Sequence, residues 1–447
     1  MLLRPKAGEG EKEGGETTMP MAESPPSIHV IGAGIVGVCC AWWLRREGFT
    51  VTLIDKAAPG DGASLGNSGN IGLASVPPLN MPGLVKKVPR MLMDPMHALT
   101  VRWRYLPKAI PWFIRFAMNT RRESVEAISD ARAALLSHAG DAFDDLLGEI
   151  GRTEMIVKSG LIQAFESADG VVRSQYALDI RRKRGVRVEE MSGNQLRELE
   201  PALSDAIKCG VWFPDVRQCI NPQRMTKAIA EAFVAAGGTL LTETVKGFDV
   251  GPDGPRRIIT EQGAHDCERV VVAAGAWSRP FARELGYDVP LEAERGYHVM
   301  IANPGVVLKT PIAASERNVS LAPMEHGLRM TTTSEFAGID APPRYDRALR
   351  IIQGARGILR DLDFEVTSRW MGARPSTPDS LPVIGRSPRF RNVLLAFGHG
   401  HLGVTFGAVT GRIVSQLARD ATPNIDIRPY RPDRDYLAGH LAASPHV

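Results

Sequence analysis

The chain has 447 residues, 44% of them hydrophobic and 23% charged, and carries a net charge of +4. This globular composition leaves room for two or three domains, and the dispersed basic residues do not indicate a nucleic-acid-binding protein. The five cysteines have neither metal-ligand nor disulfide spacing, so we expect no metal and a reduced, cytoplasmic compartment.

The first 26 residues are rich in Gly, Glu, Lys and Pro and lack the apolar segment of a signal peptide. Such a composition cannot build a hydrophobic core, so we predict a disordered tail over 1–26. No stretch reaches the roughly 18–20 uninterrupted apolar residues that a membrane span needs. The fold is therefore predicted to begin at Ser27.

A glycine triplet follows the first predicted strand. The chain runs through Gly32-x-Gly34-x-x-Gly37 into a helical stretch and a second strand that ends at Asp55. Gly32 allows the tight turn, Gly34 lets the backbone approach a pyrophosphate, and Gly37 lets the helix pack on the strand. Asp55, 23 residues after Gly32, can bind a ribose and disfavours a 2′-phosphate. The pattern predicts a Rossmann-type dinucleotide site that does not prefer NADP.

The loop that follows this strand favours FAD over NAD. It reads PGDGASLGNSGNIG over 59–72 and is rich in Gly, Ser and Asn. Its donors, among them Ser64 and Asn67, can surround a pyrophosphate and reach toward a flavin ring, whereas simple NAD dehydrogenases usually enter the next helix directly. A surface loop of turn-forming residues is the alternative.

Two later segments also favour a flavin. Residues 268–277 (ERVVVAAGAW) form a buried type of strand that ends in small residues, so backbone can pass close to a ligand. Residues 394–417 run from a strand through GHGHLG into a helix, whose N-terminus would stabilise negative charge on a reduced flavin. His399 and His401 flank this turn, either as flavin neighbours or simply as residues beside a tight turn.

The middle of the chain alternates between helical and mixed segments. Apolar residues at helical spacing over 121–150 predict an amphipathic helix, and 221–250 reads as a helix, a Gly-Gly turn and a strand. Residues 90–119 mix Arg, Lys, Trp, Tyr and Phe with prolines. This composition predicts either a peripheral membrane contact or a packed pair of cap helices.

Short strands without long helices between about 290 and 335 predict an antiparallel sheet whose face would roof the flavin. Tyr297 is the best aromatic candidate for a substrate pocket, and strand alternation places His298 on the opposite face. Arg295 shares the face of Tyr297 and is a candidate for a second substrate contact. For each of these residues, an ordinary place in the sheet is the alternative.

Arg374 lies in the unusual stretch MGARPSTPDSLPVIG, residues 371–385, among small, apolar and proline residues. The prolines stiffen the loop, and a guanidinium held there can make two parallel hydrogen bonds to a carboxylate. Arg374 is thus predicted to bind a substrate carboxylate. A salt bridge to a protein acid such as Asp379 is the structural alternative.

These motifs, in this order, resemble the FAD-dependent D-amino-acid oxidase superfamily, and within it the small subunit of bacterial D-amino-acid dehydrogenases. The resemblance covers about residues 27–420. It implies an α/β fold (α+β overall) with a Rossmann-type FAD-binding domain and an interleaved antiparallel-sheet substrate domain. It also implies that Arg374 grips the substrate carboxylate and that Val245 lies near the adenine. Gly372 stands where some sarcosine oxidases carry a flavin-linking cysteine, so we expect non-covalent FAD.

The function that the resemblance implies is oxidative deamination of a D-amino acid. A hydride passes from Cα to the flavin, and the imine is hydrolysed to a 2-oxo acid and ammonia. A quinone or carrier would then take the electrons. The same chemistry on a secondary amine, a role as the flavin subunit of a multi-subunit dehydrogenase, and a non-catalytic FAD-binding protein remain alternatives. The sequence indicates no obligatory general base.

The predicted segments are a tail over 1–26, FAD-binding parts over 27–85, 206–288 and 367–425, substrate-domain parts over 86–205 and 289–366, and a tail over 426–447. The residues expected in catalysis are Arg374 and Tyr297, and those expected to bind substrate are Arg374, Tyr297, Arg295 and His399. The residues expected to bind FAD are Gly32, Gly34, Ile35, Val36, Gly37, Asp55, Lys56, Ala63, Ser64, Asn67, Gly69, Val245, Ala274, Gly275, Trp277, Gly400, His401, Leu402, Gly403 and Thr405.

Overall fold

The structure, a computed structural model, describes residues 25–93, 99–363 and 365–435. The predicted N-terminal tail, apart from its last two residues, therefore lies outside the described residues, as does the end of the predicted C-terminal tail. Residues 94–98 of the basic and aromatic segment lie outside them as well.

The glycine triplet folds as predicted into a strand, a tight turn and a helix. β1 (Ser27–Ile31) ends at the turn, α1 (Ile35–Arg46) follows it, and β2 (Thr50–Asp55) pairs with β1 in parallel. Gly32 has a φ of +107°, which L side chains rarely adopt. The Rossmann-type unit predicted from the sequence is therefore confirmed.

This unit belongs to a sheet of six strands. The other four are β10 (Thr239–Thr242), β14 (Val270–Val272), β20 (Val383–Arg386) and β21 (Val393–Phe397). The order is β10-β2-β1-β14-β21-β20, and all neighbours are parallel except β20 and β21. Ligands of such sheets bind beyond the carboxyl ends of the strands, so the ends of β1, β14 and β21 mark where a site is expected.

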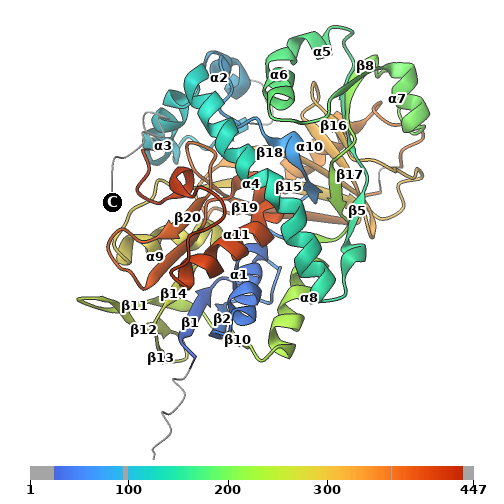
Figure 1. Cartoon of the computed structure of the whole chain (residues 1–447). Coiled ribbons are helices and arrows are strands. Elements are labelled where there is room, and N and C mark those ends of the chain that lie inside the picture. Colours follow the sequence, from blue (N-terminus) through green and yellow to red (C-terminus); the bar gives the residue numbers. More distant parts are fainter. Residues whose placement is uncertain (1–24, 94–98, 364, 436–447) are drawn as a thin grey trace, which may run out of the picture.

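Helices cover one face of the six-stranded sheet. α1 contacts α8 (Pro222–Ala235) and α11 (Gly403–Ala418), and α11 also contacts the long α4 (Arg122–Glu149), as Figure 1 shows. Gly411 lets α1 and α11 approach closely, because an added Cβ would lie 2.6 Å from the carbonyl oxygen of Cys39. The sequence predicts α4, α8 and α11, and the structure confirms all three.

The opposite face is covered by a small antiparallel sheet and a short helix. These are β11 (Val245–Gly251), β12 (Gly254–Thr260), β13 (Ala264–Asp266) and α9 (Ser278–Glu284). Buried side chains of β1, β2, β14 and β21 form one hydrophobic cluster with side chains of β11, β12 and α9. The helices, the six-stranded sheet and the small antiparallel sheet thus form a three-layer unit.

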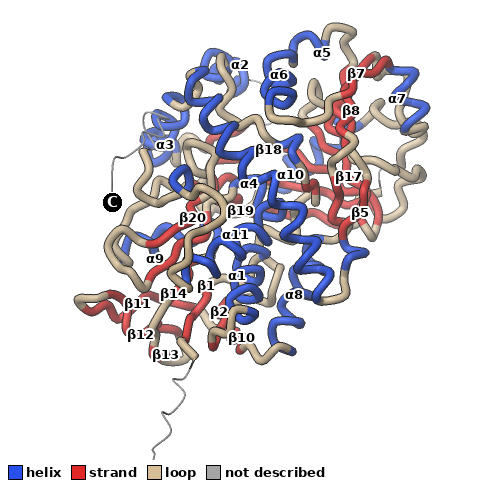
Figure 2. The backbone as a smooth tube through the Cα atoms, in the orientation of Figure 1, coloured by secondary structure: helices blue, strands red, loops and turns tan. Residues whose placement is uncertain are grey.

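A second, larger sheet contains nine strands. They are β19 (Ser368–Ser376), β15 (Glu292–Ile301), β18 (Gly327–Phe336), β17 (Val319–Met324), β16 (Ile312–Ala314), β6 (Leu161–Phe165), β8 (Cys209–Phe213), β7 (Glu189–Ser192) and β4 (Leu99–Val101), which pairs with β18. All pairings are antiparallel except β6 with β16 and β4 with β18. The predicted interleaved antiparallel-sheet domain is confirmed, and Figure 2 shows β7, β8 and β17 of this sheet above β1, β2 and β14 of the other.

Shorter elements complete the described chain. The helices are α2 (Leu84–Met93), α3 (Leu106–Met118), α5 (Gly170–Arg173), α6 (Gln175–Lys183), α7 (Gly193–Leu199) and α10 (Tyr345–Ala355). A small sheet joins β3 (Asn70–Ile71), β9 (Arg217–Cys219) and β5 (Ile156–Lys158), and single 3-10 turns are η1 (Leu73–Ser75), η2 (Thr153–Met155), η3 (Gly275–Trp277), η4 (Gly400–Leu402) and η5 (Arg428–Tyr430). Of these, η3 and η4 follow the ends of β14 and β21 and so lie where the site is expected.

Two strands that the predicted boundaries assign to FAD-binding parts belong to the sheet of the substrate domain. β8 follows the boundary at 206 and β19 follows the boundary at 367, yet both belong to the nine-stranded sheet rather than to the six-stranded one. β8 pairs with β6 and β7 of this sheet, and β19 pairs with the distant β15. Composition identifies such strands but not the sheet that they join.

A buried ion pair attaches the C-terminal segment to the loop after β19. Arg434 donates from Nε to Asp379 Oδ2 at 2.7 Å and from Nη2 to Oδ1 at 3.1 Å, and the two side chains are 3% and 4% exposed. We expect Asp379→Asn to lower the free energy of unfolding by about 3 kcal/mol, because the Arg434 charge would stay buried without its counter-charge. Denaturant unfolding of the purified protein measures this.

The matched control is Asp433→Asn, which removes the exposed ion pair with Arg431 on the same segment. Exposed pairs contribute about 0–1 kcal/mol. Equal effects of the two substitutions would contradict a stabilising role for the buried pair.

Candidate active site

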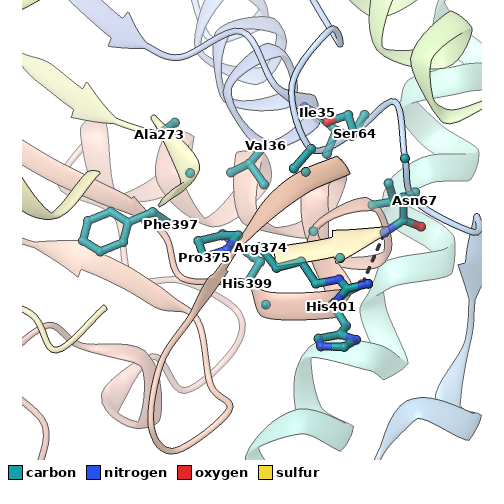
Figure 3. A pocket seen from close by; sticks show the side chains of 18 of the residues that line it. Ile35, Val36, Ser64, Asn67, Ala273, Arg374, Pro375, Phe397, His399 and His401 are labelled. Atoms are coloured by element: carbon teal, nitrogen blue, oxygen red, sulfur yellow. Dashed lines mark hydrogen bonds between the residues drawn. The ribbon is translucent and has the colours of Figure 1, made fainter. Parts of the chain in front are cut away.

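A cavity that is partly open to solvent is lined by residues of both large sheets (Figure 3). It lies where β1, β14 and β21 end, as expected for a ligand site of a parallel sheet. The predicted site residues that line it are Ile35, Val36, Ala63, Ser64, Asn67, Gly275, Tyr297, Arg374, His399, Gly400, His401 and Gly403. The predicted site residues outside its lining are Gly32, Gly34, Gly37, Asp55, Lys56, Gly69, Val245, Ala274, Trp277, Arg295, Leu402 and Thr405.

The three glycines of the triplet meet different surroundings. An added Cβ on Gly32 would lie 2.5 Å from Ala273 O, and one on Gly37 would lie 1.7 Å from Gly32 O. At Gly34 the nearest atom is Ser64 Oγ at 3.6 Å, and the same hydroxyl accepts a hydrogen bond from Ile35 N. Gly32 and Gly37 are therefore required by the fold, whereas Gly34 leaves a side open through which a ligand can approach.

Asp55 and its neighbours lie beside this turn, away from the cavity. The Asp55 carboxylate accepts hydrogen bonds from Ala33 N at 2.6 Å and Ala57 N at 3.0 Å, which holds it at the start of the turn. Lys56 Nζ lies 4.5 Å from the centre of the Trp277 ring. The prediction that these residues contact the adenosine half of a dinucleotide stays a prediction, and none of the three lines the cavity.

Two loops from distant parts of the sequence meet at the cavity. Asn67 Nδ2 donates to the His401 carbonyl oxygen at 3.3 Å, which links the loop after β2 to η4 (Figure 3). Thr405 Oγ1 donates to Asn70 O at 2.9 Å and fixes the first turn of α11 to the same loop. Gly69 lies against Cys219 O, which an added Cβ would approach to 2.2 Å. Thr405 and Gly69 thus hold the cavity wall in place without lining it.

Arg374 lies on β19 and its partner is Glu294 on β15, the residue paired with it in the sheet register. The acid named as a structural alternative, Asp379, pairs with Arg434 instead. Arg374 Nη1 lies 3.3 Å from Glu294 Oε1, and the Arg374 side chain is 22% exposed. The guanidinium lies over Gly296, where an added Cβ would come within 2.1 Å of Nη2. This contact is longer than those between Arg434 and Asp379, and the Arg374 side chain is more exposed than that of Arg434.

Glu294 is a buried acid that the sequence analysis did not select. Its side chain is 3% exposed, and its two oxygens accept from four side chains, those of His401 (2.7 Å), Arg374 (3.3 Å), Ser376 (2.7 Å) and Ser334. Burial alone would raise the pKa of this carboxyl, but His401, Arg374 and Ser334 favour its charged form and hold the pKa well below the usual range. Glu294 is thus an anion that ties Arg374 to His401.

Tyr297 and Arg295 take the other face of β15. The Tyr297 side chain is 1% exposed and donates its hydroxyl hydrogen to Glu335 Oε2 at 2.6 Å, within the cluster under α10. The Arg295 side chain is fully buried, with Nε 3.5 Å from the same oxygen. Gly296 and Glu294 occupy the face toward Arg374, so strand alternation turns the Tyr297 and Arg295 side chains away from it. Both side chains therefore pack within the sheet, and Tyr297 is also among the residues that line the cavity, whereas Arg295 is not.

Trp370 also lines the cavity, and the sequence did not mark it as a candidate. Its ring fills the space beside Gly66 and Gly372, where added Cβ atoms would lie 1.7 and 1.9 Å from ring carbons. His298 stacks on the ring with 5.1 Å between centroids. The space beside position 372 is therefore taken by an indole, which explains why a glycine stands there.

Two buried histidines near the cavity are neutral at ordinary pH. Burial, together with the charge of Arg329, lowers the pKa of His298 to about 3. Burial also lowers the pKa of His399 to about 3, and His399 Nε2 lies 3.0 Å from Thr410 Oγ1. Both imidazoles are thus weak bases inside the folded protein.

His298 should make the fold sensitive to acid. Between its ordinary pKa of 6.5 and about 3, the unfolded chain binds a proton that the folded chain does not, so stability falls as the pH falls. From pH 6.5 to 5 the wild type should lose about 1.5 kcal/mol more than His298→Phe, which keeps an aromatic ring against Trp370. Urea unfolding at the two pH values measures this difference. His326→Phe, at a 77% exposed side chain, is the control, and equal acid dependence in wild type and His298→Phe would contradict the expectation.

Comparison with known proteins gives consistent matches along the chain. Residues 27–417 match the family described as DAO, FAD dependent oxidoreductase. A D-amino-acid oxidase of Bradyrhizobium diazoefficiens is 38% identical over 414 residues, which cover 91% of this chain and 98% of the relative. A D-amino acid dehydrogenase of Paramagnetospirillum magneticum is 31% identical over 402 residues, or 87% and 94% of the two chains. The crystal structure of glycine oxidase from Geobacillus kaustophilus matches with a TM-score of 0.70 at 21% identity and covers 91% of this chain and 98% of that one, which supports the fold.

Proposed function

This chain belongs to the DAO family of FAD-dependent oxidoreductases, and we propose that its substrate is a D-amino acid whose carboxylate binds Arg374. Oxidation at Cα would leave an imine, which water converts into a 2-oxo acid and ammonia. When bound, FAD supplies the acceptor for the hydride that leaves Cα. The D configuration is supported by the two relatives named D-amino-acid oxidase and D-amino acid dehydrogenase.

The single observation that carries this proposal is the placement of Arg374. Its guanidinium lies in the cavity, over a glycine and partly exposed, and its Nη1 is 3.3 Å from Glu294 Oε1. A guanidinium recognises a carboxylate best through two parallel hydrogen bonds, as Arg434 does with Asp379 in this protein. The position of the guanidinium in the cavity, partly exposed and beside a glycine, supports a role for Arg374 in binding an incoming carboxylate.

The residues present fit FAD. Gly34 leaves the start of α1 open to a pyrophosphate, and Asp55 stands at the end of β2 where a ribose is expected. The start of α11 at Gly403 lines the cavity, so its N–H groups and dipole would stabilise negative charge on a flavin edge. Trp370 fills the side of Gly372 on which a linking cysteine would stand, which supports non-covalent binding.

The electron acceptor is proposed to be a quinone or carrier reached at a membrane surface. α3 buries Ala109 and Trp112, while Ile110 and Ile114 are 44% and 54% exposed, and Trp103 just before the helix is 73% exposed. An apolar helix face with an aromatic residue suits a membrane interface. No helix in the described part of the chain has the length and apolar character to span a membrane, so the proposed contact is peripheral.

The experiment that tests the proposed function is turnover with D-, L- and secondary amino acids, with oxygen or a water-soluble quinone as acceptor. A D-amino acid should yield one 2-oxo acid and one ammonia per two electrons. A secondary amine such as proline would yield an imine without ammonia, which identifies the alternative substrate class. Turnover only after a second protein is added would indicate the flavin subunit of a larger dehydrogenase.

A further inference from the structure

His401 and Arg374 converge on one oxygen of Glu294. His401 Nε2 lies 2.7 Å and Arg374 Nη1 lies 3.3 Å from Glu294 Oε1, so the two nitrogens are no farther apart than the sum of these distances. Both residues line the cavity, and the His401 side chain is 38% exposed. Figure 3 shows the Arg374 side chain extending beside the His401 ring. A basic imidazole therefore lies next to the proposed carboxylate-binding group.

The pairing with Glu294 determines which nitrogen of His401 can act as a base. An ionised carboxylate only accepts hydrogen bonds, so Nε2 of the neutral ring carries the hydrogen and donates it to Glu294. Nδ1 then carries the lone pair. Among the described residues, Nδ1 has no hydrogen-bond partner, and the ring is accessible from the cavity and from solvent.

The neighbouring groups are unsuited to take a proton from a substrate. Glu294 accepts from three side chains at Oε1 and one at Oε2, and its pKa is held well below the usual range, so its carboxylate is a poor base. His399, in the same turn, is 5% exposed and lies 3.0 Å from the hydroxyl of Thr410. Burial lowers the pKa of His399 to about 3, which makes it a poor base.

We propose that His401 Nδ1 accepts a proton from the ammonium group of the substrate, and that Glu294 is a positioning residue that fixes the imidazole. This inference rests on the proposed function. In an amino acid the ammonium is one carbon away from the carboxylate, so binding to Arg374 brings it near His401. The N–H bond breaks, its electron pair stays on the amine nitrogen, and the proton joins Nδ1. The amine lone pair can then assist the departure of hydride from Cα, and the imidazolium, stabilised by the Glu294 charge, returns its proton to solvent.

Few titratable or charged groups lie around His401. Glu294 faces it from β15 and Arg374 from β19, and His399 is the other titratable group of its turn. The loop over 63–69 and the first residues of α11 contain no titratable side chain. The pH dependence of the reaction should therefore be governed by His401 and by the substrate.

The test is the pH profile of flavin reduction by the substrate, measured anaerobically by stopped flow with the FAD-loaded protein. In the wild type the second-order rate constant should fall at acid pH, because a protonated imidazole cannot accept a proton from the substrate. His401→Gln should reduce that constant by about 10²-fold at neutral pH and move the acidic limb up to the ammonium pKa of the substrate, because only free amine can then react. Imidazole in the buffer should restore part of the rate in His401→Gly.

Glu294→Gln tests the positioning role with the same profile. A neutral amide no longer stabilises the imidazolium, so the acidic limb should move to lower pH, whereas a purely structural effect would lower the rate equally at every pH. His265→Gln is the matched control, because His265 forms a pair of the same 2.7 Å length with Glu243 and lines no part of the cavity.

The outcomes separate the two proposals. A wild type that no amino acid reduces would overturn the proposed function itself. A wild type that is reduced normally, with a His401→Gln variant that keeps both its rate and its acidic limb, would overturn the assignment of His401 alone.

Discussion

Arg374→Ala is expected to lower kcat/KM for the amino-acid substrate by about 10²- to 10³-fold. Loss of one partner from a desolvated charge pair costs roughly 2–5 kcal/mol, and about 1.4 kcal/mol corresponds to a factor of ten. In this protein the effect should be large for a second reason, since the buried charge of Glu294 would then lie near the substrate carboxylate and repel it. Steady-state kinetics with the preferred amino acid measures the change.

The matched control is Arg369→Ala on the same strand, where the side chain is exposed and lines no part of the cavity. It should leave kcat/KM within a factor of two or three, as surface substitutions usually do. Arg374→Lys should recover only part of the activity, because an ammonium cannot make the two parallel bonds. Near-normal kcat/KM in Arg374→Ala would mean that Arg374 serves the Glu294 pair alone.

Gly34→Val should raise the dissociation constant for FAD by at least about 100-fold. The apoprotein should stay folded. Gly34 has φ −69° and ψ 173°, which valine adopts without strain, and the nearest atom to an added Cβ is 3.6 Å away. The added side chain would instead occupy the space through which a pyrophosphate approaches. Flavin absorbance per protein and titration of the apoprotein with FAD measure the loss.

Gly37→Ala is the informative contrast, because its Cβ would lie 1.7 Å from Gly32 O. This substitution should lower the thermal unfolding temperature of the apoprotein itself, whereas Gly34→Val should not. If Gly34→Val bound FAD as the wild type does, the pyrophosphate could not lie at the start of α1.

Local patterns were sufficient to predict much of this fold. The triplet from Gly32 to Gly37 and the helical spacing of α4 depend on contacts between residues close in sequence, and both appear as predicted. The resemblance to the family also rests on motifs that are local in the sequence, and the match over residues 27–417 confirms it. Arg374 was selected for its setting, and the structure places it in the cavity.

The rest depends on pairing between distant strands. Glu294 is 80 residues from Arg374, and only the register between β15 and β19 brings them together. The face that Tyr297 takes is likewise fixed by register, since a shift of one residue would turn every side chain of β15 to the other face. The available signal was the spacing of Glu294, Gly296 and His298 at every second residue, which places one acid, one glycine and one histidine on a common face.

The most direct test of the central claim is an anaerobic visible spectrum of the purified protein, titrated with matched pairs of D- and L-amino acids. Our account predicts that D-amino acids bleach the oxidised flavin band, that L-amino acids do not, and that Arg374→Ala bleaches far more slowly with the same D-amino acid. A protein that binds FAD but is reduced by no amino acid, or equally by both enantiomers, would contradict the account.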